Sequence, residues 1–264
     1  MSSFFHWNPD PEIISFAGLS IRWYGLLFVG SFLLGTSIVK RIFKAEGKPD
    51  IDLDNLMFYM LLAAIIGARL AHCLIYEPSY YLSHPMEILY VWKGGLASHG
   101  GIVGAILALW LFIKRQPEVS LFWMFERLTI PAALVATAIR SANFINSEIV
   151  GNPTQVPWAV VFERLDSVPR HPAQLYEALA YFVTFVVLTL IYRSQNGNVK
   201  PGVLSGVMFL GIFIARFLVE FVKVPQAAYG DGLAISVGQW LSVPFILLGL
   251  VLLLCGGKFS RHAK

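Results

Sequence analysis

Seven apolar stretches, each close to 20 residues long, constrain this chain more than any other feature of its sequence. They lie near residues Ile21–Val39, Leu56–Ile75, Leu96–Ile113, Leu128–Ile145, Ala173–Tyr192, Val203–Val222 and Ala234–Leu254. A helix that crosses the hydrocarbon core of a bilayer needs about 20 mainly apolar residues. Only 14% of the 264 residues are charged, whereas soluble domains average about a quarter. We therefore predict an all-α, polytopic integral membrane protein with about seven transmembrane helices.

The remaining sequence indicates one membrane-embedded domain over residues 1–264. No internal repeat, low-complexity tract or separate soluble segment interrupts the series of apolar stretches. Cys73 and Cys255 both lie in apolar stretches, and their placement predicts neither a disulfide nor a metal site. We expect this chain to contact membrane lipid and no nucleic acid.

Lysine and arginine are distributed unevenly between the two sets of loops. The loops after the first, third, fifth and seventh stretches hold eleven of them: Lys40, Arg41, Lys44, Lys48, Lys114, Arg115, Arg193, Lys200, Lys258, Arg261 and Lys264. The N-terminal tail and the other loops hold four: Lys93, Arg164, Arg170 and Lys223. Because basic residues are enriched in cytoplasmic loops, we predict an external N-terminus and a cytoplasmic C-terminus.

A polar segment closes the fourth apolar stretch: Arg140-Ser-Ala-Asn143-Phe-Ile-Asn146-Ser-Glu148-Ile-Val-Gly151. Arg140 and Asn143 are three positions apart, so they share one face of a helix. Charged and amide groups are costly near hydrocarbon and therefore indicate a functional site. The alternative interpretation is a helix end that emerges into water, where polar residues need no special reason.

Other polar groups fall on the same predicted outer side of the membrane. They are Trp23-Tyr24-Gly25, Ser98-His99-Gly100-Gly101, the segment from Arg170 to Glu177, and Arg216 with Glu220 at i, i+4 followed by Lys223. We expect Glu220 to neutralise Arg216 in part. Five segments that meet at one level of the membrane predict a single site near the outer surface.

Several of these residues also have a structural interpretation. His99 stands among small residues and is either a packing residue or a reactive group, and Tyr24 is either an interfacial anchor or a site residue. We interpret two further pairs as structural: Arg69 with His72, and Glu126 with Arg127, the latter pair as side chains that snorkel toward water.

Two arginines within the outer halves of different helices are harder to explain structurally. The guanidinium groups of Arg140 and Arg216 suit bidentate binding of phosphate, and the phosphate available at that depth belongs to a lipid head group. His99 adds a group capable of proton transfer near neutral pH. The residues alone therefore predict an outward-facing phospholipid site.

The motifs resemble those of bacterial prolipoprotein diacylglyceryl transferases, in the same order and spacing over nearly the whole chain. The blocks that carry the resemblance are Arg140-x-Ala142-Asn143-Phe144-x-Asn146-x-Glu148-x-x-Gly151, His99-Gly100-Gly101, Trp23-Tyr24-Gly25, Arg170-His171-Pro172-x-Gln174-Leu175-Tyr176-Glu177 and Arg216-x-x-x-Glu220-Phe221. A signature of a dozen residues with four supporting blocks is far more specific than one short motif.

The resemblance implies transfer of the diacylglyceryl group of phosphatidylglycerol to the lipobox cysteine of a prolipoprotein signal peptide. A thioether forms and glycerol 1-phosphate leaves, which is the first step of bacterial lipoprotein maturation. The implied fold has seven helices in the bacterial plasma (inner) membrane, with the active site toward the outer leaflet. No metal and no soluble cofactor are expected.

The resemblance also distributes roles among the residues. It implies His99 as the base that deprotonates the substrate thiol, and Arg140 and Arg216 as cations that stabilise the leaving phosphate. The residues expected to bind phosphatidylglycerol are Arg140, Asn143, Asn146, Glu148, Gly151, Tyr24 and Glu220. Because the nucleophile belongs to the substrate, neither Cys73 nor Cys255 needs to react.

Three positions depart from the family pattern. Ile139 replaces a usual glycine before Arg140, and Lys223 replaces a basic residue that is often arginine. Ile212 replaces a tyrosine commonly found four residues before Arg216, which favours His99 as the base.

Two other classes of protein remain as alternatives. Buried arginines also line transport pathways, but the chain shows no paired halves or repeated broken helices of the kind found in transporters and flippases. A phospholipid head-group hydrolase is the second alternative. Release of glycerol phosphate in detergent would exclude a transporter, and dependence of that release on the peptide cysteine would exclude a hydrolase.

Overall fold

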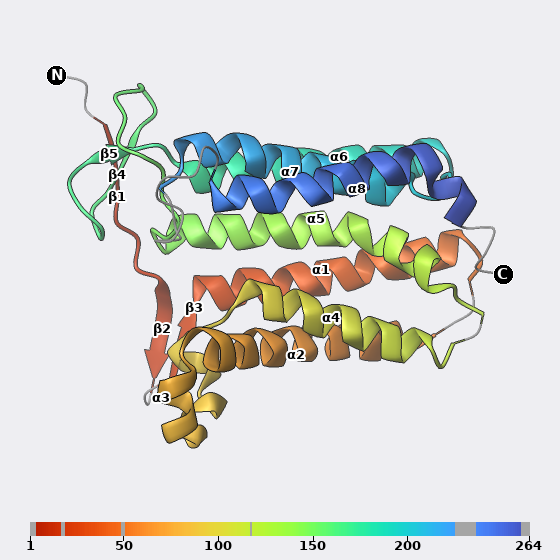
Figure 1. Ribbon diagram of the computed structural model, residues 1–264, viewed down its shortest axis with the longest axis horizontal. Coiled ribbons are helices and arrows are strands. Elements are labelled where there is room, and N and C mark those ends of the chain that lie inside the picture. Colours follow the sequence, from red (N-terminus) through yellow and green to blue (C-terminus); the bar gives the residue numbers. More distant parts are fainter. Residues whose placement is uncertain (1–3, 17–18, 49–50, 117, 225–235, 260–264) are drawn as a thin grey trace. The chain divides into compact units, whose positions relative to one another are not determined.

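The computed structural model describes residues 4–16, 19–48, 51–116, 118–224 and 236–259. Its long helices are α1 (Trp23–Ala45), α2 (Leu53–Ala71), α4 (Ser98–Ile113), α5 (Leu121–Ile145), α6 (Ala173–Ser194), α7 (Val203–Val219) and α8 (Val237–Phe259) (Figure 1). Within the described residues, six helical segments are long and apolar enough to cross a membrane, and the segment in α4 is shorter. The prediction of an all-α, polytopic membrane protein is confirmed.

The ends of the helices differ from the ends of the apolar stretches. Helix α1 continues past Val39 to Ala45, because Lys and Arg are good helix formers and extend a helix beyond its apolar part. After α2 the chain continues as one π-helical turn, η1 (His72–Tyr76). Helix α4 has 16 residues, or about 24 Å at 1.5 Å per residue. The predicted start of the last helix at Ala234 lies outside the described residues.

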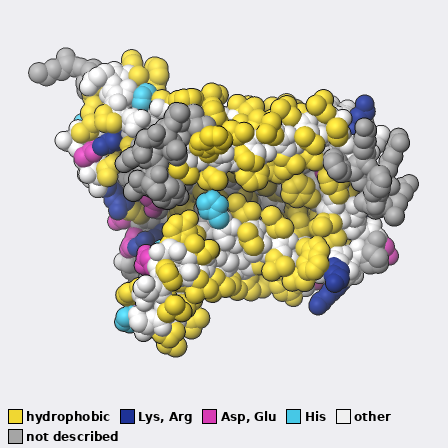
Figure 2. Space-filling model, in the orientation of Figure 1, with side chains coloured by type: hydrophobic (Ala, Val, Ile, Leu, Met, Phe, Trp, Pro, Cys, Tyr) yellow, Lys and Arg dark blue, Asp and Glu magenta, His cyan; other side chains and the backbone are white. Residues whose placement is uncertain are grey.

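Apolar side chains cover much of the lateral surface of the helices. Leu33 is 66% exposed, Leu179 65% and Leu254 83%, and hydrophobic side chains dominate the face drawn in Figure 2. Soluble proteins rarely expose apolar surface of this extent. A helix also satisfies its backbone hydrogen bonds internally, as a lipid environment requires. The surface is therefore that of a protein embedded in a bilayer.

The chain divides into two compact units. The first comprises residues 1–38 and 125–264, and the second comprises residues 39–124. The second unit holds α2 and α4 with three short helices between them: α3 (Pro78–Ser83), η2 (Pro85–Leu89) and η3 (Val91–Lys93). The expectation of a single domain over residues 1–264 stays a prediction.

In the second unit, glycines bring α2 and α4 into backbone contact. A Cβ atom on Gly100 would overlap the carbonyl oxygen of Gly67, and one on Gly104 would overlap that of Ala63. Small residues at such a contact are typical of helix pairs in membranes. The close approach fixes the start of α4, where His99 stands.

Arg69 has the structural role expected from the sequence. Its side chain is buried at the end of α2 and donates to the backbone oxygens of Ile88 (2.9 Å), Gly94 (2.6 Å) and Glu87 (2.6 Å). One guanidinium therefore satisfies three carbonyl groups of the loop that joins α2 to α4.

Two small sheets lie in the first unit. Strand β1 (Phe5–Trp7) pairs in parallel with β4 (Val160–Phe162), which pairs antiparallel with β5 (Pro169–Arg170). Strands β2 (Glu12–Phe16) and β3 (Leu19–Arg22) form a hairpin. No sequence pattern predicted them, because strands of two to five residues are too short to show a clear period of two.

An aromatic cluster joins the first sheet to the end of α5. The indole nitrogen of Trp7 donates to the carbonyl oxygen of Phe144 at 2.9 Å, and the two ring centroids are 4.5 Å apart. Phe162 of β4 packs edge-on against Phe144 at 5.7 Å. The long segment between α5 and α6 is therefore anchored beside the residues that follow Arg140.

The snorkelling interpretation of Glu126 and Arg127 is wrong. Glu126 is 1% exposed and accepts hydrogen bonds from the backbone nitrogens of Gly202 (2.8 Å) and Ser205 (3.0 Å) and from the Ser205 hydroxyl (2.5 Å). Arg127 is also buried and donates to the carbonyl oxygen of Gly197 at 3.1 Å. Because the first amides of a helix have no partner within the helix, Glu126 caps α7.

We expect Glu126→Ala to lower the stability of the protein by about 3 kcal/mol, because it leaves buried donors without an acceptor. Glu126→Gln keeps one acceptor oxygen and should cost less. The midpoint of thermal unfolding in detergent measures both effects, with the exposed Glu118→Ala as the matched control. Equal midpoints for Glu126→Ala and Glu118→Ala would contradict the capping role.

Candidate functional site

The last turns of α5 carry a linked set of polar side chains. One terminal nitrogen of Arg140 donates to Oδ1 of Asn143 at 3.3 Å, and Nδ2 of Asn143 donates to the Glu148 carboxylate at 2.9 Å. Nδ2 of Asn146 donates to the other oxygen of Glu148 at 3.1 Å. The helical spacing of Arg140 and Asn143 predicted that they share a face, and the structure confirms it.

A tight chain reversal brings Glu148 back to the helix that precedes it. Ser147 and Ile149 both have positive φ angles, 57° and 58°, which are uncommon for residues other than glycine. The amide of Glu148 donates to the carbonyl oxygen of Asn143 at 2.9 Å, and Nε2 of Gln174 on α6 donates to the carbonyl oxygen of Glu148 at 2.5 Å. The backbone of Glu148 is thus held by residues of both α5 and α6.

Two polar atoms in this reversal are buried and have no hydrogen-bond partner among the described residues. They are Oδ1 of Asn146 and the hydroxyl oxygen of Ser147. Buried polar atoms are normally satisfied by protein or water. These two atoms are therefore available to a polar ligand beside Glu148.

Arg140 has a second partner on α6. Its Nε lies 2.7 Å from the Glu177 carboxylate, whose side chain is fully buried. The other Glu177 oxygen lies 3.5 Å from the Lys223 ammonium, which contacts Glu220 at 2.8 Å. The result is a buried chain of alternating charges, Arg140–Glu177–Lys223–Glu220, in which each buried ion faces an opposite charge.

Gly151 lies where three segments of backbone meet. Its amide donates to the carbonyl oxygen of His171 at 3.0 Å, and it forms a β-bridge with Lys223. A Cβ atom there would lie 2.5 Å from Cβ of His171 and 2.8 Å from the carbonyl oxygen of Val222. Only glycine permits this approach, which aligns the reversal after α5 with the start of α6 and the end of α7.

Arg170 stabilises the backbone at Gly151. It donates to the Asp166 carboxylate at 2.5 Å and to the carbonyl oxygen of Gly151 at 3.4 Å. The hydrogen bond from Arg170 lowers the pKa of Asp166 below its usual range. The contact is therefore present at neutral pH and is lost only as the pH falls through that lowered pKa.

Tyr24 and Arg216 belong to the same region of the first unit. Tyr24, at the start of α1, lies within electrostatic range of Glu148 and Arg140. Arg216 on α7 is half-buried, and both it and Arg140 lie within electrostatic range of Tyr181. The prediction that Glu220 neutralises Arg216 is wrong, because Glu220 contacts Lys223 instead. Among the described residues, Arg216 has no carboxylate within ion-pair distance.

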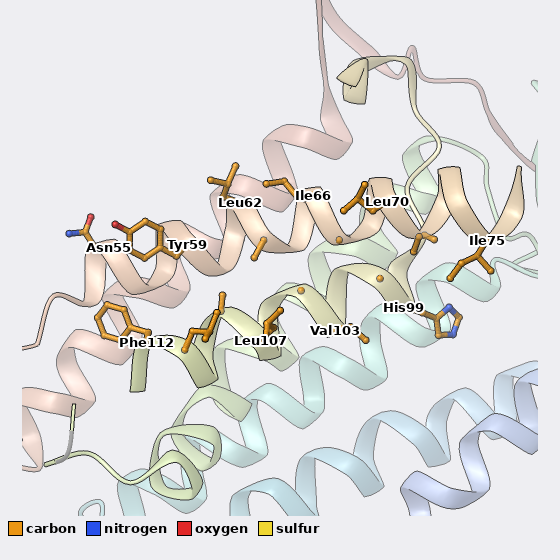
Figure 3. A pocket seen from close by; sticks show the side chains of 18 of the residues that line it. Asn55, Tyr59, Leu62, Ile66, Leu70, Ile75, His99, Val103, Leu107 and Phe112 are labelled. Carbon is orange, nitrogen blue, oxygen red and sulfur yellow. The ribbon is translucent and has the colours of Figure 1, made fainter. Parts of the chain in front are cut away.

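His99 belongs to the second unit, at the first turn of α4. It is exposed and lines an apolar groove of about 1090 Å³ between α2 and α4 (Figure 3). Apolar side chains such as Leu70, Ile75 and Val103 make up most of the wall. Exposure leaves the imidazole accessible, and the role of His99 as a base stays a prediction.

Sequence reasoning assigned eight site residues to the first unit and His99 to the second, but it missed three members of the cluster. Glu177 lay within a recognised motif without a role, Lys223 was noted beside Glu220 and as a departure from the family pattern but given no role, and Tyr181 was not considered. Each is a polar residue within or next to an apolar stretch, and this signal alone marks functional candidates in membranes.

The fold and the cluster define a class: a polytopic membrane protein with a buried, arginine-rich polar site at one end of its helices. The described part of the site can hold a phosphate group through cations and a polyol through amide and hydroxyl groups.

Comparison with known proteins gives the family. Residues 11–255 match the family model described as prolipoprotein diacylglyceryl transferase. The chain is 52% identical over 252 residues to the phosphatidylglycerol–prolipoprotein diacylglyceryl transferase of Tolumonas auensis, covering 96% of this chain and 97% of that one. It is 47% identical to the protein of the same name from Chloroherpeton thalassium, with 100% and 98% covered. The chain therefore belongs to the prolipoprotein diacylglyceryl transferase family.

Proposed function

We propose that this chain transfers the diacylglyceryl group of phosphatidylglycerol to the cysteine thiol of a prolipoprotein signal peptide. The names of its relatives supply both substrates. The thiol sulfur attacks the glyceryl carbon, the bond from that carbon to the phosphate oxygen breaks, and glycerol 1-phosphate leaves. A thioether remains on the peptide, and the thiol proton passes to a base.

The observation that carries the proposal is the arrangement around Arg140. Glu177 binds its Nε and Asn143 one terminal nitrogen, so the guanidinium is oriented, and among the described residues Glu177 is the one carboxylate that pairs with it. Arg216 adds a second cation without a described carboxylate partner. The leaving phosphate gains negative charge in the transition state, and preorganised cations stabilise that charge.

The reversal after α5 suits the head group of phosphatidylglycerol. Asn146 and Ser147 present unpartnered oxygen atoms, and the glycerol hydroxyls of the head group are hydrogen-bond donors. Glu148 holds Asn143 and Asn146 in place, and Tyr24 on α1 lies within electrostatic range of Glu148 and Arg140. Gly151 and Glu220 contribute indirectly, through the backbone junction and through Lys223.

We place the protein in the bacterial inner membrane as one domain of residues 1–264, with the site toward the outer leaflet. The excess of Lys and Arg in alternate loops supports an external N-terminus and a cytoplasmic C-terminus. The first unit agrees with this assignment, because its site lies at the helix ends that adjoin the loops with few basic residues.

The test is an assay in detergent with purified protein, phosphatidylglycerol and a peptide that carries a lipobox cysteine. We expect glycerol phosphate and a peptide heavier by one diacylglyceryl group to appear in equal amounts. A peptide with serine in place of cysteine is the control. Release of glycerol phosphate with the serine peptide would indicate a hydrolase. If folded protein released no glycerol phosphate with the cysteine peptide, the proposed transferase activity would be refuted.

His99 is the proposed base that accepts the thiol proton. We expect the rate deficit of His99→Gln to be largest near neutral pH and to shrink as the pH rises toward about 8.5, where a free thiol ionises without help. Initial rates between about pH 6 and 9 measure this deficit, and the exposed His84→Gln is the matched control. A deficit that is the same at every pH would remove His99 from the proton transfer.

A further inference from the structure

A buried phenol on α6 faces the charged cluster. Tyr181 follows Glu177 by four residues, so the two side chains lie one above the other on the same helix face. Both belong to the buried face of α6, and Tyr181 is only 3% exposed. Tyr181 therefore lies one helical turn beyond Glu177, the ion-pair partner of Arg140, on the same buried face of α6.

The packing of α6 on α7 shows what this face meets. A Cβ atom on Gly211 of α7 would overlap the side chain of Thr184 on α6, so the two helices touch there. Helices joined by a short connection run antiparallel, and only residues 195–202 separate these two. Moving from Thr184 back to Tyr181 therefore moves along α7 from Gly211 toward Arg216.

The phenol thus lies among the ionised groups of the site. Tyr181 is within electrostatic range of Glu177, Arg140 and Arg216. Two guanidinium groups repel one another, and neither can accept a hydrogen bond. A phenol oxygen can accept a hydrogen bond from a guanidinium without cancelling its charge, unlike a carboxylate.

We propose that Tyr181 is a positioning residue that holds Arg140 and Arg216 in the geometry needed by the leaving phosphate. The inference rests on the proposed transferase function. Glu177 anchors Arg140 through charge, and Tyr181 orients the arginine pair through a neutral hydroxyl while its ring excludes water. The full positive charge of Arg216 is thereby kept for the substrate.

The test is Tyr181→Phe, which removes only the hydroxyl. The arginines bind the phosphate most strongly in the transition state. Misaligned arginines therefore lower kcat more than they raise KM. We expect kcat to fall about 10- to 100-fold, with the KM for phosphatidylglycerol within about twofold and an unchanged thermal midpoint in detergent. Tyr192→Phe, about 16 Å further along the same helix, is the matched control and should retain wild-type kcat.

A double-mutant cycle shows whether Tyr181 acts through the arginines. In an Arg216→Lys background, which has already lost one of the two guanidinium groups, Tyr181→Phe should reduce kcat by a smaller factor than it does in the wild-type protein. Wild-type kcat in Tyr181→Phe, or losses that multiply in the double variant, would overturn the inference. Failure of the proposed function would differ, because the wild-type protein itself would then convert no phosphatidylglycerol.

Discussion

Replacing Arg140 by alanine should abolish turnover, and replacing it by lysine should restore little. The guanidinium binds Glu177 through Nε and Asn143 through one terminal nitrogen, and we propose that its terminal nitrogens also bind the phosphate. A lysine ammonium is a point charge that cannot hold these partners and a phosphate together. We expect a loss of about 1,000-fold for Arg140→Ala, with Arg140→Lys within about tenfold of it.

The measurement is kcat in the detergent assay, with the thermal midpoint recorded for each variant. Arg164→Ala is the control, because Arg164 is an exposed arginine of the same unit. Arg164→Ala should keep wild-type activity, which separates a general effect of lost charge from loss of the fork. Full activity in Arg140→Lys would refute bidentate recognition of phosphate by this residue.

The parts of this architecture that local sequence determines were predictable. Apolar runs of membrane length gave the helices, since hydropathy over 20 residues is a strong signal. The pairing of Arg140 with Asn143 followed from helical periodicity. The importance of Gly151 was visible only as a motif, because the sequence cannot show that His171 and Val222 leave no room for a Cβ atom there.

Contacts between distant segments were not predictable from the sequence. Periodicity paired Glu220 with Arg216, whereas the structure pairs it with Lys223, because the chain leaves regular α-helix at Glu220–Val222. The role of Glu126 required knowledge that α7 begins beside α5. The partner of Arg140 lies 37 residues away on α6, and no local pattern links Arg140 to Glu177.

Substitution of Glu177 should therefore impair the protein nearly as much as substitution of Arg140. The Glu177→Gln variant keeps the size of the side chain but removes the buried negative charge beside Arg140 and Lys223. Loss of one partner from a buried ion pair costs about 3–5 kcal/mol, so the thermal midpoint in detergent should fall clearly. Glu177→Asp keeps the charge at a shorter reach and should recover much of this stability.

The kinetic effect of Glu177→Gln should have a distinctive form. Without its anionic partner, Arg140 presents more positive charge to phosphatidylglycerol but no longer holds it in the reactive geometry. We expect the KM for phosphatidylglycerol to stay at or below the wild-type value, while kcat falls about 100-fold. Activity measured below the lowered unfolding temperature separates this effect from loss of folded protein. A wild-type kcat in Glu177→Gln would contradict it, because Arg140 would then need no anchor to stabilise the leaving phosphate.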